Sequence, residues 1–133
     1  MLDHSAAMLA FIKLAGVSQS RQQLAQRDRF LLLAAANAGE SRFDEVAERC
    51  RQLVLDHNPA HMIHRFDSVA NALADPEYQS FLRQLKRFCS YEKAEHYLTL
   101  LKIAPGLPGN ESRMSVRDYA LLLLGRAANS DPK

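Results

Sequence analysis

The feature of this sequence that most restricts its fold is the spacing of its apolar residues. In the segments with a regular pattern, apolar residues recur three or four positions apart, the spacing that places them on one face of an α-helix. Alternation of apolar and polar residues, which is typical of strands, is absent, and so are the Asn-Gly and Asp-Gly pairs that start β-hairpins. We therefore expect an all-α chain, a single multihelical domain of about seven short helices in an irregular or near-orthogonal bundle.

Capping and breaking residues set the expected boundaries of the first helices. Three helices are predicted over about 3–15, 20–38 and 42–56, with Gly16 and Gly39 ending the first two. Ser20 and Ser41 fit the N-cap position of the second and third helices, because the side chain three residues after each can complete a capping box.

Two Xaa-Pro pairs open the next two helices. Asn58-Pro59 and Asp75-Pro76 each place a favourable N-cap residue before a proline at the first helical position. A sixth helix follows Ser90, over about 91–103, and the last helix begins at Ser115. Because the connections between these helices are short, stacked helical hairpins are the alternative arrangement.

The chain is expected to form one domain over residues 1–128. Within it, the stretch 104–113 is rich in proline and glycine and predicts a loop before the last helix. Residues 129–133 predict a frayed C-terminal tail.

Composition and cysteine usage indicate the class of protein. The sequence is 47% hydrophobic and 24% charged, as is ordinary for a globular protein, and its net charge of +2 is too small to indicate an acidic partner. The N-terminus lacks the basic region of a secretory signal, and no apolar run is long enough to span a membrane. Cys50 and Cys89 lie on apolar helical faces. We therefore expect a cytoplasmic protein without a membrane contact, with both thiols reduced and buried.

Three of the five histidines lie close together, at His57, His61 and His64. On one uninterrupted helix they would share a face with the spacing of metal ligands. Pro59 argues against that helix, because proline disfavours the α conformation of the residue before it and bends the chain. We expect packing histidines at an inter-helix corner, with His61 kept neutral by the helix dipole. A small metal site at the three histidines is the third functional hypothesis.

Basic residues gather on the fifth predicted helix. Arg83, Lys86 and Arg87 are expected on the face opposite its apolar stripe, and Lys93 follows on the sixth helix. Such a face can contact phosphates, which makes a nucleic-acid-associated protein the alternative function. Glutamates lie close to these residues in the sequence, so a solvated helix face is the simpler interpretation.

The chain also has more apolar helix surface than one core requires. The first helix is apolar nearly all round, and two leucines lie outside the inward stripe of the last helix. This surplus indicates either a thick core around a central helix or an interface with a partner or a second copy of the chain.

No catalytic constellation, phosphate-binding loop or cofactor motif is recognisable. The leading hypothesis is therefore a non-enzymatic cytoplasmic protein-interaction module without a cofactor. A homodimer is one form that such a module can take. Its candidate contact residues are Phe11, Leu121 and Leu122 for an apolar contact, and His61, His64 and Arg65 for a polar one.

Overall fold

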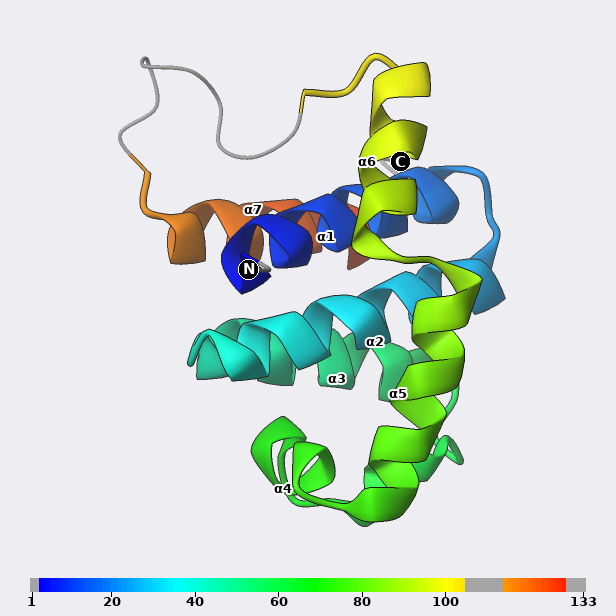
Figure 1. Cartoon of the computed structure of the whole chain (residues 1–133), viewed down its shortest axis with the longest axis vertical. Helices are drawn as coiled ribbons and strands as arrows, with labels where there is room; N and C mark the ends of the chain where they lie inside the picture. The colour runs from blue at the N-terminus through cyan, green and yellow to red at the C-terminus, as the bar shows by residue number, and fades with distance from the viewer. Residues whose placement is uncertain (1–2, 105–113, 129–133) are drawn as a thin grey trace.

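The computed structural model describes residues 3–104 and 114–128 and confirms the all-α fold (Figure 1). The predicted tail at 129–133 and nearly all of the predicted loop at 104–113 lie outside the described residues. In chain order, the helical elements of the described residues are α1 (His4–Ser20), α2 (Leu24–Glu40), α3 (Asp44–His57), the 3₁₀ helix η1 (Met62–Arg65), α4 (Val69–Leu73), α5 (Pro76–Phe88), α6 (Tyr91–Leu100) and α7 (Val116–Ala128).

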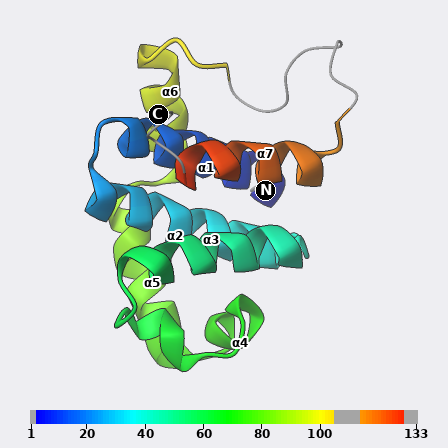
Figure 2. The same ribbon diagram turned by 180° about the vertical axis from the view of Figure 1, so that it is seen from behind.

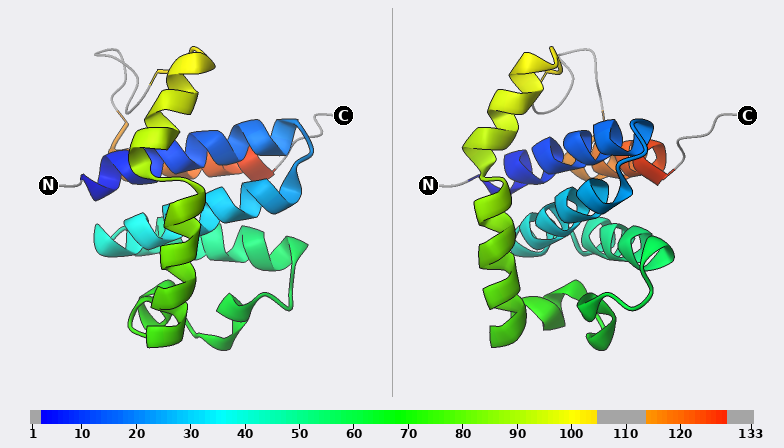
Figure 3. Two further views of the ribbon diagram at one scale, coloured as in Figure 1. Left: turned by 45° about the vertical axis from the view of Figure 1, so that its right-hand side comes forward. Right: turned by 90° about the vertical axis from the view of Figure 1, so that its right-hand side faces the viewer.

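The helices are arranged in crossing layers. α1 lies beside α7 and α2 lies beside α3, as the view from behind shows (Figure 2). α5 and α6 follow one another along one side of the molecule and run across the α1–α2 pair (Figure 3). The near-orthogonal arrangement is therefore confirmed. Because α5 and α6 do not fold back on each other, stacked helical hairpins do not describe this fold.

α1 is the central helix of the core. It packs against α2, α6 and α7, and residues on every side of it are buried. A helix that is apolar all round has to be enclosed in this way, so the central-helix explanation of its composition is correct. Phe11 is 3% exposed and stacks on Phe30 with 6.4 Å between ring centroids. It is a core residue and not the exposed partner contact that the sequence predicted.

Three helices, α1, α2 and α6, end in the same hydrogen-bonded turn. In each turn a residue other than glycine adopts the left-handed conformation, with φ of 58° at Gln22, 61° at Arg42 and 60° at Lys102. The amide of the following residue donates to the carbonyl five positions earlier, which is the Schellman pattern. The predicted glycine terminators are wrong, because α1 continues past Gly16 and α2 includes Gly39.

These closing turns also occupy the positions predicted as N-caps. The Ser20 hydroxyl donates to Val17 O in the last turn of α1, and Ser41 is the C-cap of α2. Gln23 and Phe43 immediately precede α2 and α3, and neither side chain forms a capping hydrogen bond. The capping boxes predicted at Ser20 and Ser41 are therefore wrong.

Gly39 serves packing and not helix termination. A Cβ atom at this position would lie 2.6 Å from Leu73 Cδ1 of α4, closer than real Cβ contacts. The missing side chain thus leaves room for the Leu73 side chain of α4 against α2.

The predicted fourth helix is wrong. α3 ends at His57, and Asn58 and Pro59 continue the chain into a turn. His61 then caps the short η1 through its side chain, and α4, which follows, has only five residues. The bend at Pro59 is present, but the residues after it do not form one helix.

The later helix starts are confirmed. Asp75 accepts a hydrogen bond of 3.0 Å from the Tyr78 amide at the start of α5. Ser90 and Ser115 cap α6 and α7 in the same way, at 3.2 and 3.1 Å. α6 ends at Leu100, three residues before its predicted end at 103.

Candidate functional site

The structure brings together two of the three clustered histidines. His57 and His61 line a hollow of about 200 Å³ between α2, the end of α3 and α5, together with Asp28 and Arg29. His64 is exposed and does not line this hollow. The described part of the chain contains no group of three side chains placed to hold a metal ion. Two imidazoles thus share one hollow and the third lies outside it.

Both imidazoles of the hollow are held by hydrogen bonds. His57 Nδ1 donates to Asp28 Oδ2 at 2.6 Å, since a carboxylate only accepts. His61 Nδ1 accepts from the Ile63 amide at 3.1 Å, and its ring meets Phe81 edge-on. Burial lowers the pKa of His61, and the charge of Asp28 opposes this shift. The neutral state expected for His61 is therefore favoured by burial, and the long helix whose dipole was expected to favour it does not form.

Asp28 also belongs to a buried polar network that joins three helices. Arg27 donates to Asp28 Oδ1 from Nε and Nη2, at 3.2 and 2.9 Å. The same guanidinium donates to Gln19 Oε1 of α1 at 2.6 Å and to Leu53 O of α3 at 3.2 Å. Arg27 and Asp28 are only 5% and 8% exposed. The network thus holds the wall of the histidine hollow in place. The sequence did not indicate that Arg27 and Asp28 are buried.

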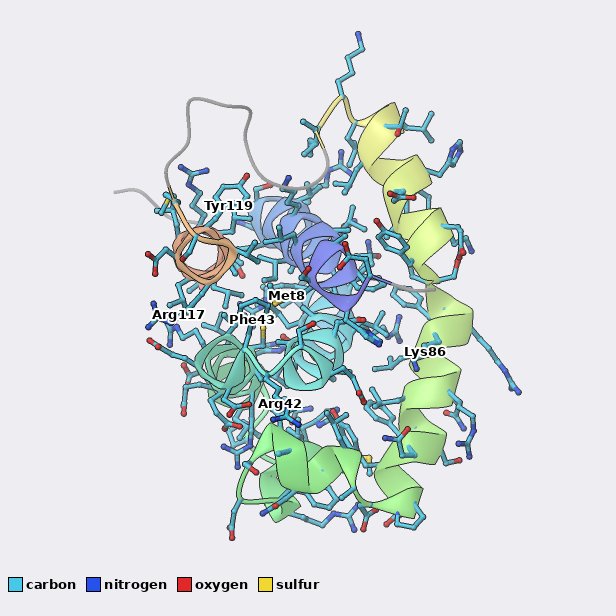
Figure 4. The ribbon with its side chains drawn as sticks, turned by 60° about the vertical axis from the view of Figure 1, so that its left-hand side comes forward. Met8, Arg42, Phe43, Lys86, Arg117 and Tyr119 are labelled. Atoms are coloured by element: carbon cyan, nitrogen blue, oxygen red, sulfur yellow. The ribbon has the colours of Figure 1, made fainter. Side chains whose placement is uncertain are left out.

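The basic residues of α5 do not share one face. Lys86 lies one turn after the buried Leu82, on the side of α5 that faces α1 and α2 (Figure 4). Arg83 and Arg87 are exposed and lie one turn apart on the outer side, and Lys93 is exposed on α6. Lys86 is therefore not part of the basic face expected on this helix. It lines a cleft between α1, α2 and α5.

The remaining predicted contact residues lie at scattered positions. On α7, Leu122 is 43% exposed and Leu121 is partly buried against the core. Arg65 is exposed and forms an ion pair of 3.6 Å with Glu77. Neither His64 nor Arg65 lines the hollow that His57 and His61 share, and neither lines the two further hollows of the molecule, one beside the end of α6 and one between α1, α2 and α5.

A groove that the sequence did not indicate lies beside the end of α6. It has a volume of about 270 Å³, and we call it the α6 groove. Its rim carries Tyr97 and Leu100, which are 40% and 65% exposed. The apolar residues beneath them are Leu14, Val17, Phe30, Phe88 and Leu101. On one helix the leucines at 98, 100 and 101 cannot all face the core, so a surface leucine is expected here, but nothing in the sequence indicates a groove beside it.

A second, larger hollow lies between the start of α1, the end of α2, and α5. It has a volume of about 320 Å³, and we call it the α1–α5 cleft. Apolar residues from four helices, α1, α2, α4 and α5, line it, and so do His4, Glu40, Lys86 and Glu92. His4 is held by a contact of 2.7 Å between its Nδ1 and Asn37 Oδ1. No sequence pattern links these residues, because they come from distant segments.

The two hollows flank the line where α5 and α6 cross the α1–α2 pair. The α1–α5 cleft uses the first half of α1 and the second half of α2, and the α6 groove uses the opposite halves. No helix in the described ranges has the length and apolar character needed to cross a membrane. The chain matches no protein-family model, no curated protein and no solved structure.

Proposed function

We propose that the protein is a non-enzymatic interaction module that binds an apolar helix of a partner protein through the α6 groove. The observation that carries this proposal is the exposure of Tyr97 and Leu100 at the rim of a hollow with an apolar floor. Single exposed apolar side chains are common on monomers. Apolar side chains that surround a concave apolar surface are instead typical of binding sites.

The construction of the groove favours a helical partner. Its walls come from α1, α2, α5 and α6, so the space between them can accept apolar side chains from one face of a further helix. Phe30 and Phe88 in the floor offer large ring surfaces for such contacts. Binding by strand addition needs an exposed sheet edge, and the described residues form only helices and their connections.

Charge around the groove favours a partner with acidic residues. Arg21 lines the hollow, and the Arg29 guanidinium lies 5.1 Å from the centre of the Phe88 ring. No carboxylate is among the described lining residues. Acidic residues beside the apolar face of a partner would therefore be attracted. A second copy of the chain docked groove to groove would bring like charges together, so we favour a different protein over a homodimer.

Labelled helical peptides test this proposal by fluorescence anisotropy. Two peptides share one stripe of leucine and phenylalanine, and the stripe is flanked by glutamate in one and by lysine in the other. We expect the glutamate-flanked peptide to bind more tightly, because the rim is basic. Leu100→Glu should abolish this binding, because it removes an apolar contact and adds repulsion.

Leu122→Glu is the matched control, since Leu122 is also an exposed leucine but lies on α7. Binding that is lost with Leu122→Glu and kept with Leu100→Glu would move the site to the surface that the sequence favoured. Equal binding of the two peptides would contradict the charge argument. A dimer in light scattering that Leu100→Glu dissociates would make a second copy of the chain the occupant.

The nucleic-acid alternative has less support. Arg83, Lys86, Arg87 and Lys93 are all exposed along α5 and α6, but Lys86 also lines the α1–α5 cleft, apart from the other three. Fewer phosphate contacts mean weaker and less salt-dependent binding.

We also propose that the module works in the reducing cytoplasm, because Cys50 and Cys89 are both buried and free.

A further inference from the structure

We infer that the α1–α5 cleft is a binding site for an apolar α-amino acid in its zwitterionic form. The volume of the cleft, about 320 Å³, lies near the lower end of the range of small-molecule sites, which is about 300–1,000 Å³. A ligand of this site is therefore small. The inference is independent of the proposed partner binding, because the cleft and the α6 groove lie on opposite sides of the crossing helices.

The floor of the cleft is apolar and comes from three helices. Ala7 and Phe11 of α1, Leu33 of α2 and Leu82 of α5 line it. Phe11 and Leu82 are 3% and 2% exposed, so the cleft reaches down to the core. An aliphatic or aromatic side chain in the cleft would replace water against these residues, which is the main source of affinity for a small ligand.

Several polar side chains of the cleft are already used by the fold. The Asn37 amide donates a hydrogen bond to Leu33 O at 2.9 Å, and its Oδ1 atom is hydrogen-bonded to His4 Nδ1. Gln79 donates to Leu73 O at 2.6 Å. The Ser90 hydroxyl caps α6, and the Tyr91 hydroxyl donates to Glu95. These groups shape the wall, and the groups left for a ligand are the charged ones.

Three charged side chains of the cleft form no ion pair with the described residues: Glu40, Lys86 and Glu92. They come from α2, α5 and α6, and Lys86 lies on the side of α5 that faces α1 and α2 (Figure 4). A simple carboxylate would be repelled by the two glutamates, and a simple amine by the lysine. An α-amino acid offers its carboxylate to Lys86 and its ammonium group to the glutamates.

Three probes that differ only in charge test the inference on the full chain. L-phenylalanine, 3-phenylpropionate and phenethylamine share one aromatic ring, but the second lacks the ammonium group and the third lacks the carboxylate. Titrations followed by amide NMR shifts should show saturable binding of L-phenylalanine, with a Kd on the order of 1 mM. The shifted amides should belong to the cleft, and the other two probes should bind more weakly.

Variants of exposed residues locate the site without disturbing the fold. Lys86→Met and Glu40→Gln should each weaken L-phenylalanine binding by about two- to fivefold, the factor expected of an exposed ion pair. Arg83→Met, on the outer side of the same helix, should leave it unchanged. The inference is overturned by any of three results: no saturable shifts, an equal affinity for either singly charged probe, or an equal loss with Arg83→Met. Lys86→Met should keep peptide binding at the α6 groove, which separates the two proposals.

Discussion

Replacing Asp28 by asparagine tests the buried network in the wall of the histidine hollow. The substitution keeps the shape of the side chain and removes its negative charge. Arg27, which is 5% exposed, then retains only the two neutral acceptors Gln19 Oε1 and Leu53 O besides the amide oxygen. Removing one partner of a buried ion pair typically costs about 3–5 kcal/mol, because the other charge stays buried without compensation.

We expect a loss near the lower end of that range, about 3 kcal/mol. The two neutral acceptors still satisfy part of the guanidinium, and the other partner, His57, has a side chain that is 38% exposed. Stability of a domain is about 5–15 kcal/mol, so the folded state should survive. The amide must also present its NH₂ group to either Arg27 or His57, and His57 is the partner that can change its tautomer to accept.

Urea unfolding followed by circular dichroism measures the effect. With a slope of about 2 kcal/mol per molar urea, the midpoint should fall by about 1.5 M. His57→Gln should cost only about 1 kcal/mol, because it leaves no buried charge unpaired. The double variant Arg27→Met with Asp28→Leu should recover most of the loss, since replacing a buried pair by apolar residues is often nearly neutral.

Two results would refute this reasoning. A loss below about 1 kcal/mol for Asp28→Asn would mean that water reaches the guanidinium and that the network is not energetically buried. A double variant as unstable as Asp28→Asn alone would mean that the contribution comes from packing and not from charge pairing.

Three further predictions concern single residues. Arg42→Gly should stabilise the fold by about 0.5–1 kcal/mol in urea unfolding, because Arg42 adopts the left-handed conformation with φ 61°, which glycine adopts without strain. Arg49→Gly inside α3 is the control and should destabilise the fold by about 1 kcal/mol. Because burial lowers the pKa of His61 in the folded state, stability should be lost as pH falls through the ordinary histidine pKa of about 6.5, and the loss should be smaller in His61→Gln. Burial raises the pKa of Cys50 to about 12 and also raises that of Cys89, so neither thiol should react with iodoacetamide until urea unfolds the chain.

Helix boundaries could be predicted from the sequence where they depend on local bonds. The starts of α5, α6 and α7 depend on a side chain that caps an amide three residues later, as Asp75 does for Tyr78. The ends of α1 and α2 are equally local, but Gln22 and Arg42 occupy the left-handed positions where glycine is the expected residue. Their sequence therefore carries no signal for the turn.

The prediction of the fourth helix failed for a different reason. Side chains of another helix form hydrogen bonds with backbone groups that the fourth helix would need. Glu48 of α3 accepts from the Val69 amide at 2.7 Å, and Arg51 of α3 donates to Phe66 O at 2.7 Å. Both backbone groups would form intrahelical bonds in a continuous helix. Residues 62–73 have helical spacing of apolar residues, but spacing does not reveal that charged side chains of α3 replace these bonds.

The candidate sites could not be predicted because they depend on where helices cross. α1 and α2 each have 17 residues and are therefore about 26 Å long, whereas a crossing helix covers a width of only about 10–12 Å. One perpendicular line of helices near the middle of this pair thus leaves both ends of its face uncovered. α5 and α6 form that line, and the α1–α5 cleft and the α6 groove are the two uncovered ends.

The position of the line is set by the buried residues of α5 and α6, such as Leu82 and Leu98, and by the bend after His57 that directs the chain toward α5. Capping and periodicity describe each helix separately, so they identify the helices that form these surfaces but not the surfaces themselves.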